Sequence, residues 1–168
     1  MWRRWEVEQE TYRKIVEKYA NIVFRTAYSY CKNRSDAEDI VQNTFLKLLT
    51  GTYEFRDEEH LRKWLIRVTV NQAKNLHLSF WKQKVLPLEC SEAEPNPQFE
   101  TEEQSRLFEA VRELPPKYRI VVHLYYYEEY SVKEIAQILK IRETTVQTQL
   151  MRARNKLKSR LEEWQNEQ

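Results

Sequence analysis

The side chains best suited to chemistry lie between Ser131 and Arg154, where they could contact nucleic acid. Ser131 with Glu134 is a capping box that predicts a short helix, and about three turn residues separate it from a longer helix. This helix-turn-helix pattern can place its second helix in a major groove. The exposed face of that helix offers Thr144, Thr145, Gln147, Thr148, Met151 and Arg152 to base edges or phosphates. A structural hairpin with a solvated basic face is the alternative.

A second candidate surface is the stretch from His60 to Leu88, which has six basic residues and no acidic one. Aromatic and amide side chains accompany these charges, namely Trp64, Asn71, Asn75, Phe80 and Trp81. This composition suits unpaired bases as well as phosphates. Trp64 follows the apolar period and is expected in the core. Phe55 lies outside that period and either stacks on a base or staples the following helix; its position alone favours the staple.

An acidic and polar face on a further predicted helix could bind a basic protein surface. Its members are Asp36, Glu38, Asp39, Gln42 and Asn43. Acidic residues in a first helical turn commonly serve the helix dipole, and the residues alone favour that simpler role.

Catalytic and metal chemistry are not indicated. The three histidines are dispersed, and Cys31 and Cys90 lack the close spacing of zinc or redox sites. Gly51 is the single glycine, which argues against phosphate-cradling loops, dinucleotide-binding folds and nucleophile elbows. We therefore expect no catalytic residue, no metal and no cofactor.

The elements that position these residues are predicted to be helices throughout, because apolar residues recur at helical spacing. Ser35 with Glu38 is expected to cap a helix that ends at Gly51, and Asp57 to cap the next. The apolar phase slips at residues 71–73, where we expect a loop or kink. The three consecutive tyrosines at residues 125–127 are expected in the core and at its margin.

The predicted fold class is all-α, with two small helical domains joined by a flexible linker. Periodicity is lost and prolines gather at residues 85–100, which separate an N-terminal domain at residues 8–84 from a C-terminal domain at residues 101–163 that holds the helix-turn-helix. Thr101 with Gln104 is expected to cap the first helix of the second domain.

Charge and hydropathy indicate where in the cell the protein is expected to act. The formal net charge is only +2, yet seven basic residues stand against Glu143 alone between Lys140 and Arg160, so each domain has a basic end. No apolar run approaches the roughly 20 residues of a membrane span, and the start lacks the apolar segment of a signal peptide. We expect a cytoplasmic protein with no direct membrane insertion.

Several segments also resemble a known family. Residues 36–49, Phe55-Arg56 and residues 64–75 are similar to the polymerase-binding and promoter-melting region of bacterial sigma factors. Residues 114–119, 130–139 and 145–154 resemble the region of those proteins that reads the upstream promoter element. Two such lobes joined by a linker resemble the extracytoplasmic-function (ECF) group of sigma factors.

This resemblance implies a partner for each surface. The residues matched to the core RNA polymerase-binding face are Asp36, Asp39, Gln42 and Asn43. Those matched to the −10 DNA contacts are Phe55, Arg56, Arg67, Asn71, Lys74 and Asn75, which favours a base contact for Phe55. Those matched to the −35 DNA contacts are Arg142, Thr144, Thr145, Gln147, Thr148, Met151, Arg152 and Arg154. The resemblance further implies an anti-sigma factor, which in such systems can be anchored in a membrane.

Some residues depart from the family's pattern. Asn43 stands where an acidic residue is usual. Lys140 and Arg142 replace the common turn glycine and capping serine, and each change is expected to cost about 1 kcal/mol. Gln147 and Gln149 stand where basic residues are common, which predicts a preference for adenine and a shallower salt dependence at the −35 element.

We therefore expect a sigma factor that binds core RNA polymerase and promoter DNA, reading −35 as duplex and −10 as a melted strand, and that is not an enzyme by itself. One alternative is a helix-turn-helix regulator that acts without polymerase. Another is a helical interaction protein whose basic faces bind an acidic protein.

Overall fold

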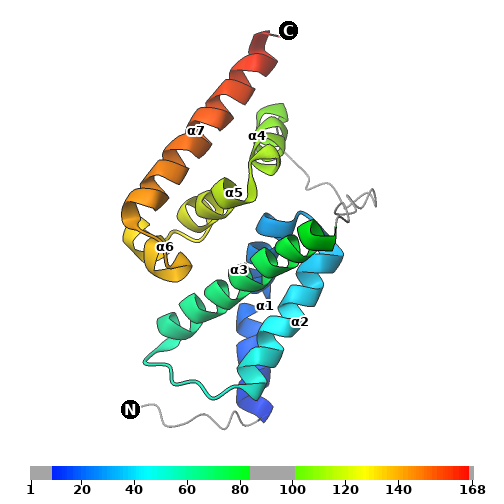
Figure 1. Ribbon diagram of the computed structural model, residues 1–168, viewed down its shortest axis with the longest axis vertical. Coiled ribbons are helices and arrows are strands. Elements are labelled where there is room, and N and C mark those ends of the chain that lie inside the picture. The colour runs from blue at the N-terminus through cyan, green and yellow to red at the C-terminus, as the bar shows by residue number, and fades with distance from the viewer. Residues whose placement is uncertain (1–8, 84–100, 167–168) are drawn as a thin grey trace. The chain divides into compact units, whose positions relative to one another are not determined.

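The computed structural model describes residues 9–83 and 101–166, and the chain divides into two compact units, Met1–Pro87 and Leu88–Gln168. Within the described residues there are helices and no strand, which confirms the all-α class (Figure 1). The expected linker at residues 85–100 lies outside the described part. Across residues 9–83 and 101–166, no helix combines the length and the apolar character that a membrane crossing requires.

Within residues 9–83, the first unit has three helices that pack against one another: α1 (Gln9–Cys31), α2 (Arg34–Thr50) and α3 (Glu58–Gln83) (Figure 1). Each contributes a stripe of apolar residues at spacings of three and four, because those positions share one face of a helix. The stripes form a core that includes Val23, Ala27, Ala37, Ile40, Phe45, Leu48, Leu65, Ile66, Val70 and Ala73.

Helix α3 runs without interruption, so the loop or kink expected at residues 71–73 is wrong. Val70 and Ala73 are fully buried, and they continue the apolar stripe through the place where the pattern seemed to slip. The side-chain amide of Gln72 donates a hydrogen bond to the hydroxyl of Thr44 on α2, at 3.0 Å. Neither glycine nor proline interrupts the segment, so nothing locally breaks the helix.

Helix α2 begins earlier than its expected cap. The side chain of Asn33, not that of Ser35, accepts a hydrogen bond from the backbone N–H of Asp36, at 3.0 Å, and Ser35 lies within the first turn. Asparagine and serine are about equally good at this position, so the spacing to Glu38 was a misleading signal. Gly51 does cap the other end, with its N–H donating to the Lys47 carbonyl, although its backbone is extended.

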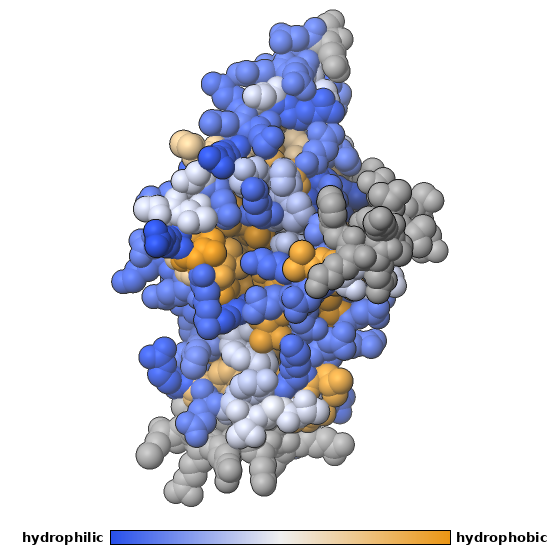
Figure 2. Space-filling model, viewed as in Figure 1, coloured by the Kyte–Doolittle hydropathy of each residue, from blue (hydrophilic) through white to orange (hydrophobic). Residues whose placement is uncertain are grey.

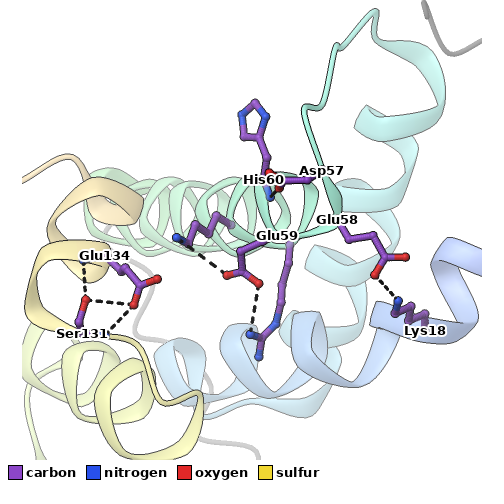
Figure 3. A network of polar contacts seen from close by, with 9 residues as sticks. Lys18, Asp57, Glu58, Glu59, His60, Ser131 and Glu134 are labelled. Carbon is purple, nitrogen blue, oxygen red and sulfur yellow. Dashed lines mark hydrogen bonds and ion pairs between the residues drawn. The ribbon is translucent and has the colours of Figure 1, made fainter. Parts of the chain in front are cut away.

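The second unit contains α4 (Glu102–Glu113), α5 (Pro116–Val122), a π-helical turn η1 (His123–Tyr127), α6 (Val132–Leu139) and α7 (Glu143–Asn166). Helix α7 packs against α4, α5 and α6. Their buried residues include Leu114, Tyr118, Ile120, Val121, Leu124, Ile135, Val146, Leu150 and Ala153. As expected, Thr101 caps α4, and Ser131 and Glu134 form a reciprocal capping box at α6 (Figure 3).

The break between α4 and α5 is closed by a buried arginine. Pro115 and Pro116 stop α4 and leave the carbonyls of its last turn without helical partners. The guanidinium of Arg119 lies beneath them and donates to the carbonyls of Arg112 and Leu114, at 3.2 and 2.5 Å. Arg119 is only 5% exposed, and these two carbonyl groups compensate for the burial of its charge.

The run of tyrosines was expected in the core and at its margin, and this is wrong for two of the three. Tyr126 is 53% exposed and Tyr127 is 74% exposed, while Tyr125 is half-buried. They lie in η1, where the buried anchors are instead His123 and Leu124. The wider π-helical turn changes the angle between successive residues, so helical periodicity misplaces them.

Candidate nucleic-acid and polymerase-binding surfaces

Four of the residues matched to the −10 contacts form one stripe along α3. Arg67, Asn71, Lys74 and Asn75 follow one another at spacings of four, three and one, so an uninterrupted helix brings them to the same side. Asn71 and Asn75 are exposed, and Arg67 and Lys74 are half-buried. The stripe therefore places two amides and two cations on one face of α3.

The cations of this stripe differ from those at the start of the same helix. Arg62 and Lys63 both lie near the Glu59 carboxylate, at 3.9 and 4.0 Å. Glu58 pairs with Lys18 of α1 at 2.6 Å (Figure 3). Within the described residues, Arg67 and Lys74 have no ion pair or hydrogen bond of their side chains. Their charge is therefore available to an external anion.

The loop before α3 is held by an aromatic cluster, defined here as Tyr53, Phe55, His60 and Trp64. Ring centroids lie 4.4 Å apart for Tyr53 and Trp64, and 5.5 Å apart for Phe55 and Trp64. The backbone N–H of His60 donates to the Asp57 carboxylate at 2.7 Å, and this hydrogen bond forms the N-terminal cap of α3 (Figure 3).

Phe55 is thus packed beside the helix start, and its ring is half-buried. This placement suits the staple, and it leaves part of the ring free to stack. Trp64 is also half-buried, so the expectation that it lies in the core holds only in part. Arg56 is exposed, and its backbone N–H donates to His60 Nδ1 at 3.2 Å.

Gly51 is required by this cluster. A Cβ atom at position 51 would overlap the ring of Tyr53, which lies directly against the glycine backbone. The glycine therefore serves a close approach and not a left-handed turn, since its φ is −90°.

The helix-turn-helix expected from the sequence is formed by α6, a turn at residues 140–142, and α7. Lys140 adopts the left-handed conformation that a glycine usually takes there, with φ of 52°. Its N–H and that of Ile141 both donate to the Ala136 carbonyl and close the helix end. Ala136 of α6 is buried, at 6% exposed, and α6 packs against α7.

The outer face of α7 is mixed in character. Gln147 and Thr144 are exposed, and so is Met151 at 52%. Thr145 and Thr148 are half-buried, and the Thr148 hydroxyl donates to its own helix at the Thr144 carbonyl, 2.8 Å away. Arg142 is exposed at the start of the helix. The predicted −35 residues of α7 thus span about half of the helix circumference, a surface that Arg142 extends at the helix start.

Two of the three arginines of this surface, Arg152 and Arg154, have partners on neighbouring elements. Arg152 lies beside Tyr118 of α5, and the pKa of the Tyr118 hydroxyl is lowered chiefly by hydrogen bonding to Arg152 and further by the nearby Lys117 and Lys156 charges. Arg154 Nε donates to the Tyr126 hydroxyl at 2.8 Å. Neither tyrosine was predicted to contact an arginine, because each lies far from its partner along the chain.

The predicted polymerase-binding residues share one side of α2. Asp39, Gln42 and Asn43 are exposed, whereas Asp36 is half-buried. Burial, followed by the nearby Asp39 charge, raises the pKa of Asp36 above its ordinary value.

Two leucines extend this α2 surface and were missed from the sequence. Leu46 and Leu49 are 53% and 48% exposed. Both are out of phase with the buried Thr44, Phe45 and Leu48, which is the signal that could have found them. The surface therefore combines acidic, amide and apolar groups, a composition suited to a protein partner.

Among the described residues there is no group of three or more His, Cys, Asp or Glu side chains that could hold a metal ion. The thiol of Cys31 is half-buried, and Cys90 lies outside the described part.

Comparisons with known proteins agree with this geometry. The family model for Sigma-70 region 2 matches residues 15–82, and that for Sigma-70, region 4 matches residues 104–157. RNA polymerase sigma factor SigV of Bacillus subtilis (strain 168) is 32% identical over 130 residues, which cover 77% of this chain and 78% of SigV. ECF RNA polymerase sigma factor SigM of the same strain is 28% identical over 158 residues, with coverage of 89% and 94%.

The chain therefore belongs to the sigma-70 family of RNA polymerase sigma factors, which act in transcription initiation. Within that family its two matched regions and its relatives identify it as an ECF sigma factor.

Solved structures show the same fold. RpoE from Bartonella quintana, in complex with the anti-sigma factor NepR, is similar with a TM-score of 0.70 at 20% identity, covering 91% of this chain and 98% of RpoE. CnrH, in complex with the cytosolic domain of CnrY, is similar with a TM-score of 0.66 at 22% identity, covering 93% and 90%.

Proposed function

We propose that this sigma factor binds core RNA polymerase through the exposed face of α2, reads a −35 element as duplex with α7, and holds a −10 element as a melted strand on α3. The observation that carries the proposal is the stripe on α3. Arg67 and Lys74 remain unpaired within the described residues, and Asn71 and Asn75 stand between and beside them. Cations that neutralise phosphates next to amides that bind base edges suit a single strand.

Melting follows from preferential binding and needs no nucleotide hydrolysis. Extruding a base from a duplex costs a few kcal/mol of unstacking and unpairing. An aromatic contact to an unstacked base returns about 1–3 kcal/mol, and phosphate contacts add to it. Phe55, in the loop before α3, is the aromatic side chain proposed for that contact. The open strand is thus bound more tightly than the duplex, and the equilibrium shifts toward it.

At the −35 element the base contacts fall to the outer face of α7. Recognition helices contact base edges chiefly with their N-terminal residues, which here include Thr144, Gln147 and Thr148. A glutamine can pair with both N6 and N7 of adenine, whereas an arginine in its place would favour guanine. Gln147 therefore shifts the preferred sequence toward adenine.

The proposed partners are core RNA polymerase, promoter DNA and an anti-sigma factor. Support for the last comes from RpoE, whose solved complex contains the anti-sigma factor NepR. We place the protein in the cytoplasm with no catalytic activity of its own, as its proposed partners require.

The proposal is tested by charge reversal on α2, with binding to core polymerase and transcription from a duplex promoter as readouts. Asp39→Arg should weaken retention of core polymerase at least tenfold and abolish transcripts. Glu17→Arg is the matched control, because Glu17 is an exposed carboxylate on α1 and pairs with Arg13 at 3.1 Å. Unchanged transcription by Asp39→Arg would contradict the proposed face.

Two further measurements, duplex binding by the chain alone and competition by DNA, separate the alternatives. A regulator that acts without polymerase would bind the promoter duplex tightly alone, usually as a dimer on a palindrome. A helical interaction protein would bind its acidic partner without competition from DNA.

A further inference from the structure

Two arginines flank the face of α7 that is proposed to read bases. Arg152 and Arg154 are two residues apart and therefore about 200° apart around an α-helix. Between them, on the side away from the core, lie the exposed and half-buried residues of the base-reading stripe: Thr144, Gln147, Thr148 and Met151. The stripe itself carries no charge, so the attraction to phosphates must come from its flanks.

Arg154 is held in place by tyrosines of the π-helical turn. Its Nε donates to the Tyr126 hydroxyl at 2.8 Å. Its guanidinium carbon lies 5.6 Å from the ring centroid of Tyr125 and 5.7 Å from that of Tyr126. The two rings meet edge to face, with centroids 4.9 Å apart, and form a corner around the guanidinium.

The hydrogen bond to Tyr126 leaves the terminal nitrogens of the Arg154 guanidinium available. Only Nε is engaged, so both terminal nitrogens remain as donors. Within the described residues Arg154 has no carboxylate partner, in contrast to Arg160 on the same helix, which pairs with Glu113 at 2.8 Å and Glu163 at 3.2 Å. The Tyr126 hydroxyl accepts from Arg154 and keeps its own hydrogen to donate.

The place of Arg154 along α7 indicates what these donors meet. It lies ten residues beyond Thr144, or about 15 Å along the helix axis. Because the N-terminal residues of a recognition helix contact base edges, a side chain this far along reaches the sugar-phosphate backbone.

We propose that Tyr126 is a positioning residue, which fixes Arg154 so that the pair clamps one backbone phosphate beside the −35 element. This inference rests on the proposed −35 function. It also gives the consecutive tyrosines separate tasks, since Tyr127 does not contact Arg154 and stacks instead on His123, with ring centroids 5.7 Å apart.

The test uses the full chain assembled with core RNA polymerase. The probe is a duplex that this complex selects from a randomised library, labelled for fluorescence anisotropy and prepared with a single methylphosphonate at each backbone position in turn. Tyr126→Phe keeps the ring and removes the hydroxyl, and Tyr127→Phe is the matched control on the neighbouring exposed tyrosine.

Arg154→Gln should weaken binding about tenfold and lower the slope of log Kd against log salt by about 0.9, the value for one phosphate contact. Tyr126→Phe should weaken binding about threefold with the slope and the melting temperature unchanged, because the charge and the fold remain. It should have no further effect when Arg154→Gln is already present. One methylphosphonate should abolish the effects of both variants.

Two results would overturn the inference alone: a Tyr126→Phe effect no larger than that of Tyr127→Phe, or full additivity with Arg154→Gln. If Arg154→Gln and Arg152→Gln both bind the selected duplex like the wild type, the −35 assignment of α7 fails and the inference fails with it. Loss of binding by Arg154→Gln, with wild-type binding by Tyr126→Phe, would preserve the −35 assignment and refute the role of Tyr126.

Discussion

Removing the unpaired cations of α3 should flatten the salt dependence of binding to melted DNA. Each phosphate of a single strand that a cation neutralises contributes about 0.7 to the slope of log Kd against log salt. Arg67→Gln with Lys74→Gln removes two such cations, so the slope should fall by about 1.4. Between 50 and 200 mM salt, the wild type should therefore lose about sevenfold more affinity than the double variant.

The assay is anisotropy of a labelled promoter whose −10 segment is already unpaired, titrated with holoenzyme at four salt concentrations. Arg62→Gln with Lys63→Gln is the matched control, because both cations lie near Glu59 at 3.9 and 4.0 Å. Their removal should change the slope much less. An unchanged slope for the first pair, or an equal change for the control pair, would refute the reasoning from ion pairing.

Three further variants test single positions. Gly51→Ala should lower the free energy of unfolding by about 1–3 kcal/mol, because its methyl group displaces the Tyr53 ring; urea denaturation should show no such loss for the exposed Thr52→Ala. Lys140→Gly should raise stability by about 0.5–1 kcal/mol by relieving a left-handed lysine, a gain that Lys140→Ala cannot give, as thermal unfolding would reveal. Gln147→Arg should move the preferred −35 base from adenine toward guanine and steepen the salt dependence, and selection from a randomised duplex library would disprove the adenine preference if neither changed.

Most helices were predictable because their caps, stops and apolar spacing agree with the way the helices pack. The Ser131 capping box, the Asp57 cap and the stop at Pro115 each depend on groups within four residues of the helix end. The sites on α3 and α7 could be predicted as far as residue types and helical spacing define them. The residues of each site share a face because each of these segments is one continuous helix.

The misplacements have physical causes that sequence spacing does not carry. Asn33 competes with Ser35 for the same cap, and their intrinsic preferences do not decide between them. The kink expected at residues 71–73 came from counting Gln72 as a break, yet its amide reaches Thr44 on another helix. The π-helical turn at residues 123–127 alters the angular step and exposes two tyrosines.

The left-handed turns explain how a chain with a single glycine folds. Lys32, Glu129 and Lys140 all have positive φ, at 56°, 57° and 52°. Each stores strain of about 1 kcal/mol that a glycine would avoid. Lysine and glutamate do not mark left-handed turns, so Lys32 and Glu129 could not be located from the sequence, and Lys140 was located only from the turn glycine common at its place in the family.

The most direct measurement is base unstacking in a linear duplex promoter. A single 2-aminopurine is placed at successive positions of the −10 segment, and fluorescence is followed when holoenzyme is added without nucleotides. Fluorescence should rise at one or more adjacent positions and should fall back toward the duplex level with Asn71→Ala and Lys74→Gln. Holoenzyme that occupies the −35 element while every −10 position stays stacked would show that this sigma factor does not open DNA by binding the melted strand.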